Sequence, residues 1–312
     1  MKRIGLFIIL TVLTMMLVAC GGQEAGDNNN ADEKEMITVT HELGETEVQK
    51  NPEKIVVFDF GVLDTLEQLG IDVTGVPQGN IPSYLEKYES DDYENVGSLK
   101  EPDFEKIAII DPDLIIISGR QADLYDQLQE LGDTIYLGVD PNRYMDSFKE
   151  NLDIIGEVFE KETEVADALS DIEATISEVK EKAEDNDEKA LIILANDDKI
   201  SAYGSNSRFG IIHDVFGIPA VDENIEVSTH GMNVTFEYVA ENNPDILYVI
   251  DRSAAIGEES SAKQIVENKF TEKTNAYKND RIYYLNPDYW YLSGGGLISV
   301  SEMAKEIETS LQ

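Results

Sequence analysis

Short apolar runs alternate with segments of helical periodicity along much of the chain. The apolar runs, which we expect to form strands, lie at 55–60, 114–117, 135–137, 190–194, 200–203 and 246–250. The segments with helical spacing lie at 63–69, 122–131, 144–159 and near 208–216. Buried strands that alternate with helices are typical of β-α units around a parallel sheet. The pattern therefore predicts an α/β protein with parallel-rich sheets.

One helical segment is much longer than the others. Its apolar residues recur at steps of three and four, at Val165, Leu169, Ile172, Ile176, Val179 and Ala183. No glycine or proline occurs between Gly156 and Gly204. A helix over 163–185 would be about 35 Å long. We expect this helix to run from one lobe of the protein to another.

The chain also contains an internal repeat. Residues 103–120 read DFEKIAIIDPDLIIISGR, and residues 235–252 read TFEYVAENNPDILYVIDR. The copies share, without a gap, a Phe-Glu pair, an alanine, a Pro-Asp pair and a final arginine. Each copy is typical of a short helix, a turn and a buried strand that ends in arginine. The repeat predicts two lobes of similar build, 37–162 and 186–312, with a ligand cleft between them.

The N-terminus has the pattern of an export signal. Lys2 and Arg3 precede an apolar run that is too short to cross a bilayer comfortably. The run leads into Leu-Val-Ala-Cys, which resembles the lipobox of bacterial lipoproteins, and Cys20 is the one cysteine of the chain. We expect residues 1–19 to be a signal peptide and Cys20 to carry lipid on the outer face of the cell membrane. The polar residues 20–36 would form a flexible tether.

Composition narrows the classes of function. The chain carries 24 Lys and Arg against 63 Asp and Glu, a formal net charge of −39. A surface of this charge repels nucleic acid, which is therefore not an expected partner. No P-loop, nucleophile elbow or HExxH motif is present, and the glycines at 294–296 lack the spacing of a dinucleotide site. We expect a binding protein without an intrinsic cofactor, and not an enzyme.

Three arginines stand at positions suited to an anionic ligand. Arg120 and Arg252 end the strands of the two repeats, and ligands of parallel sheets bind outside the carboxyl ends of the strands. Arg208 follows Gly-Ser-Asn-Ser at the expected start of a helix, where free backbone N–H groups also favour an anion. One arginine alone would more often pair with a surface carboxylate. The repeat, however, places two at equivalent strand ends, which favours a binding role.

Two other residues have chemistry of interest. His230 lies in the loop sequence VSTHGM, and Tyr291 lies in the aromatic sequence DYWYL. A loop histidine is usually solvated, and a tyrosine among aromatic residues is usually packed. Spacing alone therefore does not make either one a ligand.

Together these features resemble the substrate-binding lipoproteins of iron-siderophore ABC importers. The resemblance covers residues 37–312 and rests on the lipobox, EPDFEKIAIIDPDLII and its second copy, the joining helix and the aromatic-glycine segment. The stretches GNIPSYLEKY, GSNSRFGIIHDVFG and DYWYLSGGG look most like the petrobactin and catecholate branch. The resemblance implies a class III periplasmic-binding-protein fold, with two α/β lobes joined by a single long helix. It also implies a monomer that delivers a ferric siderophore to an ABC import permease.

The resemblance assigns roles in ligand binding. In that branch three arginines hold the anionic ferric complex, and the matching residues are Arg120, Arg208 and Arg252. Trp290 offers a ring beside the planar catecholates. Related sequences often carry a lysine where this chain has Gln78, which leaves the charge of the ligand open.

It also assigns roles in metal binding and in transport. In some members a histidine and a tyrosine complete the coordination of Fe(III), which corresponds to His230 and Tyr291. One glutamate from each lobe docks on the permease, which corresponds to Glu105 and Glu237. A carboxylate in a first helical turn also stabilises its own helix, so docking is not the single explanation of these glutamates.

Two other functions stay open at this stage. Cobalamin and haem are bound by proteins of the same architecture, although Met232 and His230 are a weak pair of axial haem ligands. A different class of protein, an extracellular adhesion or signalling lipoprotein, would use the acidic surface instead of a cleft. The arginines at the two strand ends argue against this second alternative.

Overall fold

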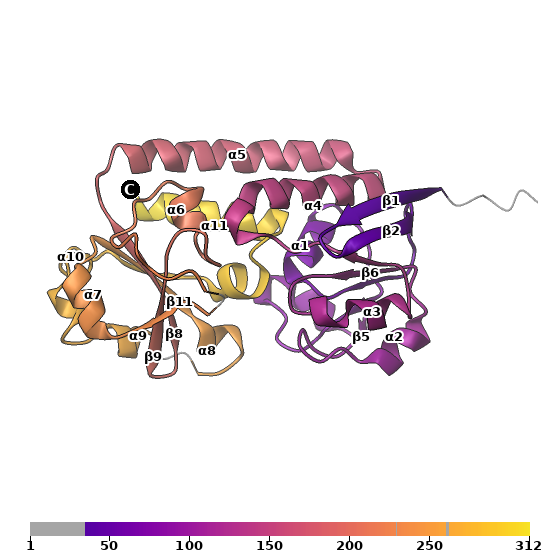
Figure 1. The fold of residues 1–312 in the computed structure, drawn as a ribbon, viewed down its shortest axis with the longest axis horizontal. Coiled ribbons are helices and arrows are strands. Elements are labelled where there is room, and N and C mark those ends of the chain that lie inside the picture. The colour runs from indigo at the N-terminus through magenta and orange to yellow at the C-terminus, as the bar shows by residue number, and fades with distance from the viewer. Residues whose placement is uncertain (1–34, 229, 260–261) are drawn as a thin grey trace, which may run out of the picture. The chain divides into compact units, whose positions relative to one another are not determined.

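The computed structural model describes residues 35–228, 230–259 and 262–312 (Figure 1). The expected signal peptide and the lipid site at Cys20 lie outside these residues. In the part of the chain that the structure describes, no helix is both long enough and apolar enough to cross a membrane. The described residues form two lobes, each built on a five-stranded sheet.

The N-terminal lobe contains a fully parallel sheet with strand order β5-β4-β3-β6-β7. These strands are β3 (Ile55–Val57), β4 (Gly75–Val76), β5 (Glu94–Asn95), β6 (Leu114–Ile117) and β7 (Thr134–Tyr136). The helices of this lobe are α1 (Phe60–Gln68), α2 (Phe104–Ile110), α3 (Tyr125–Gln129) and α4 (Tyr144–Phe159). Short 3-10 segments are η1 (Ser83–Glu89), η2 (Ala122–Leu124) and η3 (Pro141–Arg143), and an antiparallel hairpin joins β1 (Met36–His41) and β2 (Gly44–Gln49).

The C-terminal lobe contains a mixed sheet with strand order β10-β9-β8-β11-β12. Its strands are β8 (Ala190–Asn196), β9 (Lys199–Tyr203), β10 (Met232–Val234), β11 (Ile246–Asp251) and β12 (Ile282–Leu285). Strand β9 runs opposite to the other four strands of this sheet, because a two-residue turn at Asp197 and Asp198 folds it back on β8, and it pairs antiparallel with both β8 and β10. The short helices are α6 (Ile211–Asp214), α7 (Phe236–Asn242), α8 (Arg252–Ala255), α9 (Ala262–Val266) and α10 (Asn275–Lys278), with the 3-10 turn η4 (Thr271–Lys273).

One long helix joins the lobes, and a second helix packs across their junction. Helix α5 (Glu162–Glu184) runs along both of them, as the sequence predicts for a single long joining helix (Figure 1). Helix α11 (Leu297–Ser310) follows the C-terminal sheet in sequence, but packs against both α5 and α1. Side chains from α1, α5 and α11 belong to one hydrophobic core that also includes residues of both sheets. The lobes therefore share one hydrophobic core and are not independent domains joined by a flexible linker.

The two copies of the internal repeat have the same local structure. Asp103 caps the N-terminus of α2 and Thr235 caps that of α7, and each side-chain oxygen accepts a backbone N–H three residues later. Both helices end in a residue with left-handed backbone, at Asp111 and Asn243. A Pro-Asp pair then leads into a buried strand, β6 in one lobe and β11 in the other.

The prediction of a helix near 208–216 is largely wrong. Only Ile211–Asp214 form a helix, because the preceding residues use their polar groups in tight local turns. The side chain of Ser207 donates to the carbonyl of Gly204, and the backbone N–H of Asn206, which has a φ of 58°, donates to Asp214 at 2.6 Å. Arg208 therefore does not begin a helix, and no helix N-terminus contributes to an anion site there. Similarly, the helix expected at 122–131 is divided into η2 and α3.

Candidate ligand-binding site

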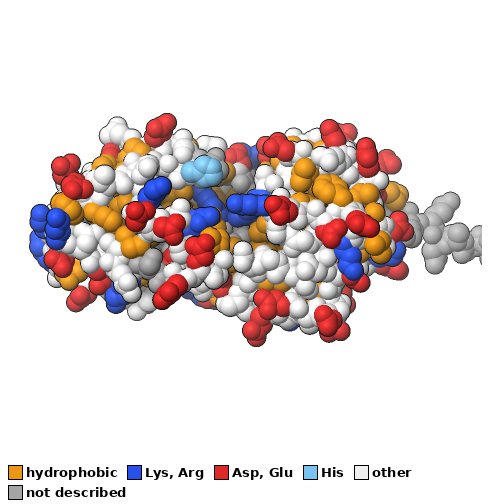
Figure 2. Space-filling view, turned by 90° about the horizontal axis from the view of Figure 1, so that it is seen from below, with side chains coloured by type: hydrophobic (Ala, Val, Ile, Leu, Met, Phe, Trp, Pro, Cys, Tyr) orange, Lys and Arg blue, Asp and Glu red, His pale blue; other side chains and the backbone are white. Residues whose placement is uncertain are grey.

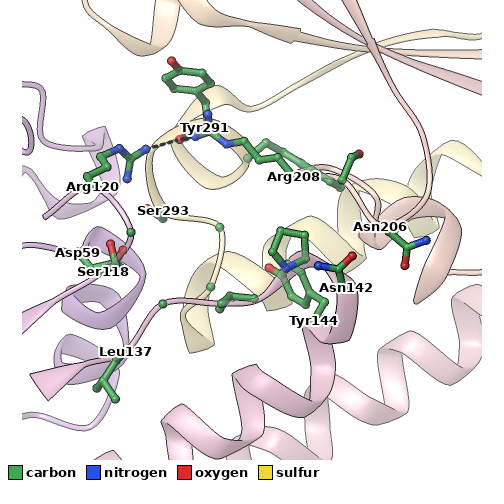
Figure 3. A pocket seen from close by; sticks show the side chains of 18 of the residues that line it. Asp59, Ser118, Arg120, Leu137, Asn142, Tyr144, Asn206, Arg208, Tyr291 and Ser293 are labelled. Carbon is green, nitrogen blue, oxygen red and sulfur yellow. Dashed lines mark hydrogen bonds between the residues drawn. The ribbon is translucent and has the colours of Figure 1, made fainter. Parts of the chain in front are cut away.

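Two adjoining cavities lie where the lobes meet. The larger has a volume of about 620 Å³ and is lined by residues of both lobes (Figure 3). The smaller has a volume of about 200 Å³ and is lined by residues of the C-terminal lobe, including Tyr291 and Arg208. Arg208 and Tyr291 line both cavities, so these two residues form the boundary between them.

The three predicted arginines are brought together around Tyr291, and we call them the cleft arginines. Arg120 follows β6 on an exposed turn, and its Nη2 lies 3.4 Å from the carbonyl oxygen of Tyr291 (Figure 3). Arg208 donates to the same carbonyl from the opposite side, and its guanidinium carbon lies 4.2 Å from the centre of the Tyr291 ring. Arg252 begins α8, donates to Oδ1 of Asn196 at 2.9 Å and lines the smaller cavity.

The cleft arginines have no carboxylate partner among the described residues. By contrast, the other two arginines in this part of the chain do form ion pairs, Arg143 with Glu150 and Arg281 with Glu188. Lys and Arg side chains gather beside the hollow of the surface in Figure 2, while Asp and Glu cover the flanking surfaces. A partly buried cation that lacks a counter-ion is costly. Two such cations, Arg208 and Arg252, beside the exposed Arg120 in a chain with a net charge of −39, therefore indicate a site for an anion.

Tyr291 has an unusual electrostatic environment. Burial alone would raise the pKa of its phenol, but the guanidiniums of Arg208 and Arg252 outweigh burial, and the pKa is lowered. Burial lowers the pKa of Arg208, and the nearby charge of Arg120 lowers it further. The phenol of Tyr291 is therefore easier to deprotonate than that of a tyrosine in water, which favours binding of a hard metal ion.

Trp290 and His230 occupy different surroundings. Trp290 lines the larger cavity but is only 2% exposed, and its indole N–H donates to Oε2 of Glu306 at 2.6 Å. His230 is exposed, in a turn, and lines the smaller cavity together with Tyr291 and Arg252. The structure thus places His230 and Tyr291 on one cavity. Trp290 is a buried wall residue whose orientation is fixed by Glu306.

Sequence reasoning missed the wall that the N-terminal lobe contributes. This wall of the larger cavity includes Asp59, Ser118, Tyr136, Asn142 and Tyr144. Asp59 and Ser118 follow the buried strands β3 and β6, so the strand-end rule that found Arg120 could also have found them. Nothing in the pattern of the sequence singles out Tyr144, which lies on the first turn of α4.

The N-terminal lobe also holds the segment that carries Tyr291. This segment contains the π-helical turn η5 (Asp288–Ser293) and the start of α11. Its hydrogen bonds to the N-terminal lobe join Ser83 to Asp288, Tyr84 to Ser293, Thr65 to Leu297, and Asp64 to Ile298 and Ser299. Asp64 is fully buried, and its carboxylate accepts the backbone N–H groups of α11 at 3.1 and 3.0 Å. We call this set of contacts the seam.

Glu105 and Glu237 lie away from both cavities. Each is exposed in the first turn of its helix, α2 for Glu105 and α7 for Glu237. Gln78 also lies outside the cavities, because its amide donates to backbone carbonyls of Tyr88, Ser90 and Tyr93. Its role in this structure is to hold the end of η1, and it does not contact the cavity.

The comparisons with known proteins agree with this geometry. The sequence profile described as periplasmic binding protein matches residues 55–289. The petrobactin-binding protein YclQ of Bacillus subtilis (strain 168) is 50% identical over 316 residues, which cover all of both chains. The ferric-anguibactin-binding protein FatB of Vibrio anguillarum is 30% identical over 277 residues, 87% of this chain and 86% of FatB.

A solved structure supports the same relationship. The crystal structure of YclQ from Bacillus subtilis superimposes with a TM-score of 0.88 at 53% identity, and the match covers 89% of this chain and 99% of that one. The agreement extends over both lobes and the helix that joins them. The chain therefore belongs to the periplasmic binding protein family.

Proposed function

We propose that this chain is an extracytoplasmic binding protein that captures a ferric siderophore of the catecholate or petrobactin type and delivers it to an ABC import permease. The observation that carries this proposal is the set of three cleft arginines without carboxylate partners. Ferric catecholates are planar and anionic, and the guanidinium fork suits such ligands. The 50% identity with a petrobactin-binding protein supports the same ligand class.

Tyr291 and His230 are the proposed protein ligands of the iron. They line one cavity, and the lowered pKa of Tyr291 makes its phenolate easier to form than that of an ordinary tyrosine. Iron(III) has six coordination positions in such complexes, so protein ligands bind only when the siderophore leaves positions open. The metal arrives as part of the cargo, and the protein adds at most two donor atoms.

The test is a titration of residues 35–312, which form one compact unit, with ferric siderophores. Trp290 is the single tryptophan of the chain and lines the larger cavity, so its fluorescence reports on the site directly. We expect strong quenching by a ferric bis-catecholate and little by a ferric trihydroxamate of neutral charge. Tight binding of cobalamin or haem in place of the ferric catecholate would contradict the proposal.

We further propose that Glu105 and Glu237 dock the loaded protein on the permease. Their support is that both are exposed at equivalent positions of the repeat, one on each lobe. The double variant Glu105→Arg with Glu237→Arg should fold and bind ligand normally, but fail to support uptake in cells. The matched control is Glu241→Arg, which changes another exposed glutamate of α7. Normal uptake by the double variant would leave both glutamates as helix-terminus residues.

The division of the full chain is also part of this proposal. Residues 1–19 would be the signal peptide, 20–36 the tether with lipid on Cys20, and 37–162 and 186–312 the two lobes joined by 163–185. Incorporation of labelled palmitate into the wild-type chain, and its loss in Cys20→Ala, would test the anchor. The proposed location is the outer face of the cell membrane.

A further inference from the structure

The larger cavity has sides of opposite charge. Arg120 and Arg208 stand next to Tyr291, whereas Asp59 lies on the wall of the N-terminal lobe beside Ser118 (Figure 3). Among the described residues that line the two cavities, Asp59 is the one carboxylate. An anion held by the arginines would be repelled by Asp59 if negative charge extended to that wall. The cavity therefore favours a ligand whose charge differs from one end to the other.

The position of Asp59 is fixed by the fold. Asp59 is the N-cap of α1, and its Oδ1 accepts the backbone N–H groups of Gly61 at 2.8 Å and Val62 at 3.0 Å. Its Oδ2 has no hydrogen bond, and no lysine or arginine forms an ion pair with it, within the described part of the chain. One carboxylate oxygen is thus used by the helix. The other is left available on a side chain that lines the cavity.

A second polar group without a partner lies on the same wall. The hydroxyl of Tyr144 is buried and makes no hydrogen bond among the described residues, although Tyr144 lines the cavity. Burial raises the pKa of Tyr144, and the negative charges of Asp64 and Asp59 raise it further. Buried polar groups are normally hydrogen-bonded. A polar group of a ligand could supply the partner that the Tyr144 hydroxyl lacks.

We propose that Asp59 receives a protonated amine in the backbone of the siderophore, so that this site selects ligands that carry such an amine beside their anionic chelating groups. The inference rests on the proposed function and specifies its ligand further. A protonated amine is a charge-assisted donor to a carboxylate, and the partly enclosed cavity strengthens the contact. Loss of one such contact lowers affinity by about tenfold to one hundredfold.

The experiment compares two synthetic bis-catecholate siderophores of equal length. One has a secondary amine in its linker, and the other has a methylene group at the same place. Dissociation constants of both ferric complexes are measured by quenching of Trp290 for wild type and for Asp59→Asn. Asparagine caps a helix as well as aspartate does, so this variant removes the charge and keeps the cap. We expect wild type to prefer the amine ligand at least tenfold and the variant to bind both ligands equally.

Asp140→Asn is the matched control, because Asp140 caps η3 nearby but does not line the cavity. It should keep the preference of the wild type. Equal affinity of wild type for the two ligands, or an unchanged preference in Asp59→Asn, would overturn the inference while leaving the proposed function intact. Failure of wild type to bind either ferric complex would overturn the proposed function itself.

Discussion

The two lobes are built on the same repeat but contribute different physics to the site. In the C-terminal lobe, Arg252 is half-buried, bonded to Asn196 and close to Tyr291. In the N-terminal lobe, Arg120 is exposed and makes one long contact with the Tyr291 carbonyl. The N-terminal lobe contributes one wall of the larger cavity and the seam. The repeated unit therefore fixes the position of each arginine in its lobe. The neighbouring segments determine how buried the arginine is, and so how strongly its charge can bind a ligand.

The largest expected effect concerns the seam. A Cβ added at Gly296 would collide with Oδ1 of Asp64 and the backbone oxygen of Gly61. Gly296→Ala should therefore lower the free energy of unfolding by about 3 kcal/mol. Thermal denaturation of wild type and variant measures this loss. The matched control is Gly119→Ala, since its Cβ would lie 3.7 Å from the nearest atom, the Tyr136 hydroxyl. Equal melting temperatures for the two variants would contradict the tight packing of the seam at Gly296.

The next effect concerns the charge of the C-terminal lobe. Arg208 is partly buried between the two cavities and contacts both the ring and the carbonyl of Tyr291. Arg208→Ala should weaken ferric-siderophore binding by about 2–4 kcal/mol, because the anion loses a partly desolvated partner. Titration followed by Trp290 fluorescence gives the loss. An affinity within threefold of wild type would show that the charge lies elsewhere.

A pH dependence of stability would sharpen the role of the seam. Burial raises the pKa of Asp64 from 3.8 to about 7, despite hydrogen bonds from Ser299 and Tyr84 that lower it. The folded state therefore favours the protonated carboxyl. The stabilisation is complete below pH 3.8 and is lost as the pH rises through about 7. Asp64→Asn has no such proton, so its stability relative to wild type should rise across this window.

Denaturant unfolding at several pH values provides the measurement. Burial also raises the pKa of Glu306, which accepts a hydrogen bond from the Trp290 indole. Both proteins contain Glu306 in the same surroundings, so its titration contributes equally to the two stability curves and cancels in their difference. Parallel curves of stability against pH for wild type and Asp64→Asn would show that Asp64 does not titrate in this range.

A smaller effect is expected at the phenol between the lobes. Tyr291→Phe removes the phenolate while keeping the ring over Arg208. With a tetradentate ferric siderophore we expect loss of the contribution that the phenolate adds to the visible charge-transfer spectrum, and about tenfold weaker binding, roughly 1.4 kcal/mol. With a hexadentate siderophore the spectrum and affinity should be unchanged. A tetradentate complex with the same spectrum in both proteins would make Tyr291 a packing residue.

The smallest effect is expected at the exposed arginine. Arg120→Ala should weaken binding by about 0.5–1 kcal/mol at low salt, because water and salt screen the interaction between exposed charges. The difference from wild type should shrink as salt rises. Titrations at two salt concentrations measure it. A loss as large as that of Arg208→Ala would remove the contrast between the lobes.

Much of the fold could be predicted from periodicity, because strands β6 and β8 and helix α4 follow regular patterns of burial. The reversed direction of β9 could not, since it depends on a two-residue turn between apolar runs that read like any others. The short α6 was also missed, because helical spacing in 208–216 is overridden by local hydrogen bonds around Ser207.

The site was predictable where the repeat or the strand-end rule applied. The repeat placed Arg120 and Arg252 on two lobes, and the structure brings both to Tyr291. The seam could not be foreseen, since Asp64 and Ser299 are 235 residues apart in sequence and no local pattern links them. The signal that could have raised the question is Asp64, an acidic residue directly after the apolar residues that begin α1.

The place of α11 in sequence has a consequence for the order of events during folding. Its apolar face completes the core over α1, and Leu297 donates to Thr65 across 232 positions of the chain. A chain synthesised from its N-terminus therefore exposes the apolar face of α1 until the last helix has been made. Contacts between segments so distant form slowly. The growing chain therefore exposes apolar surface that is prone to aggregation for most of its synthesis.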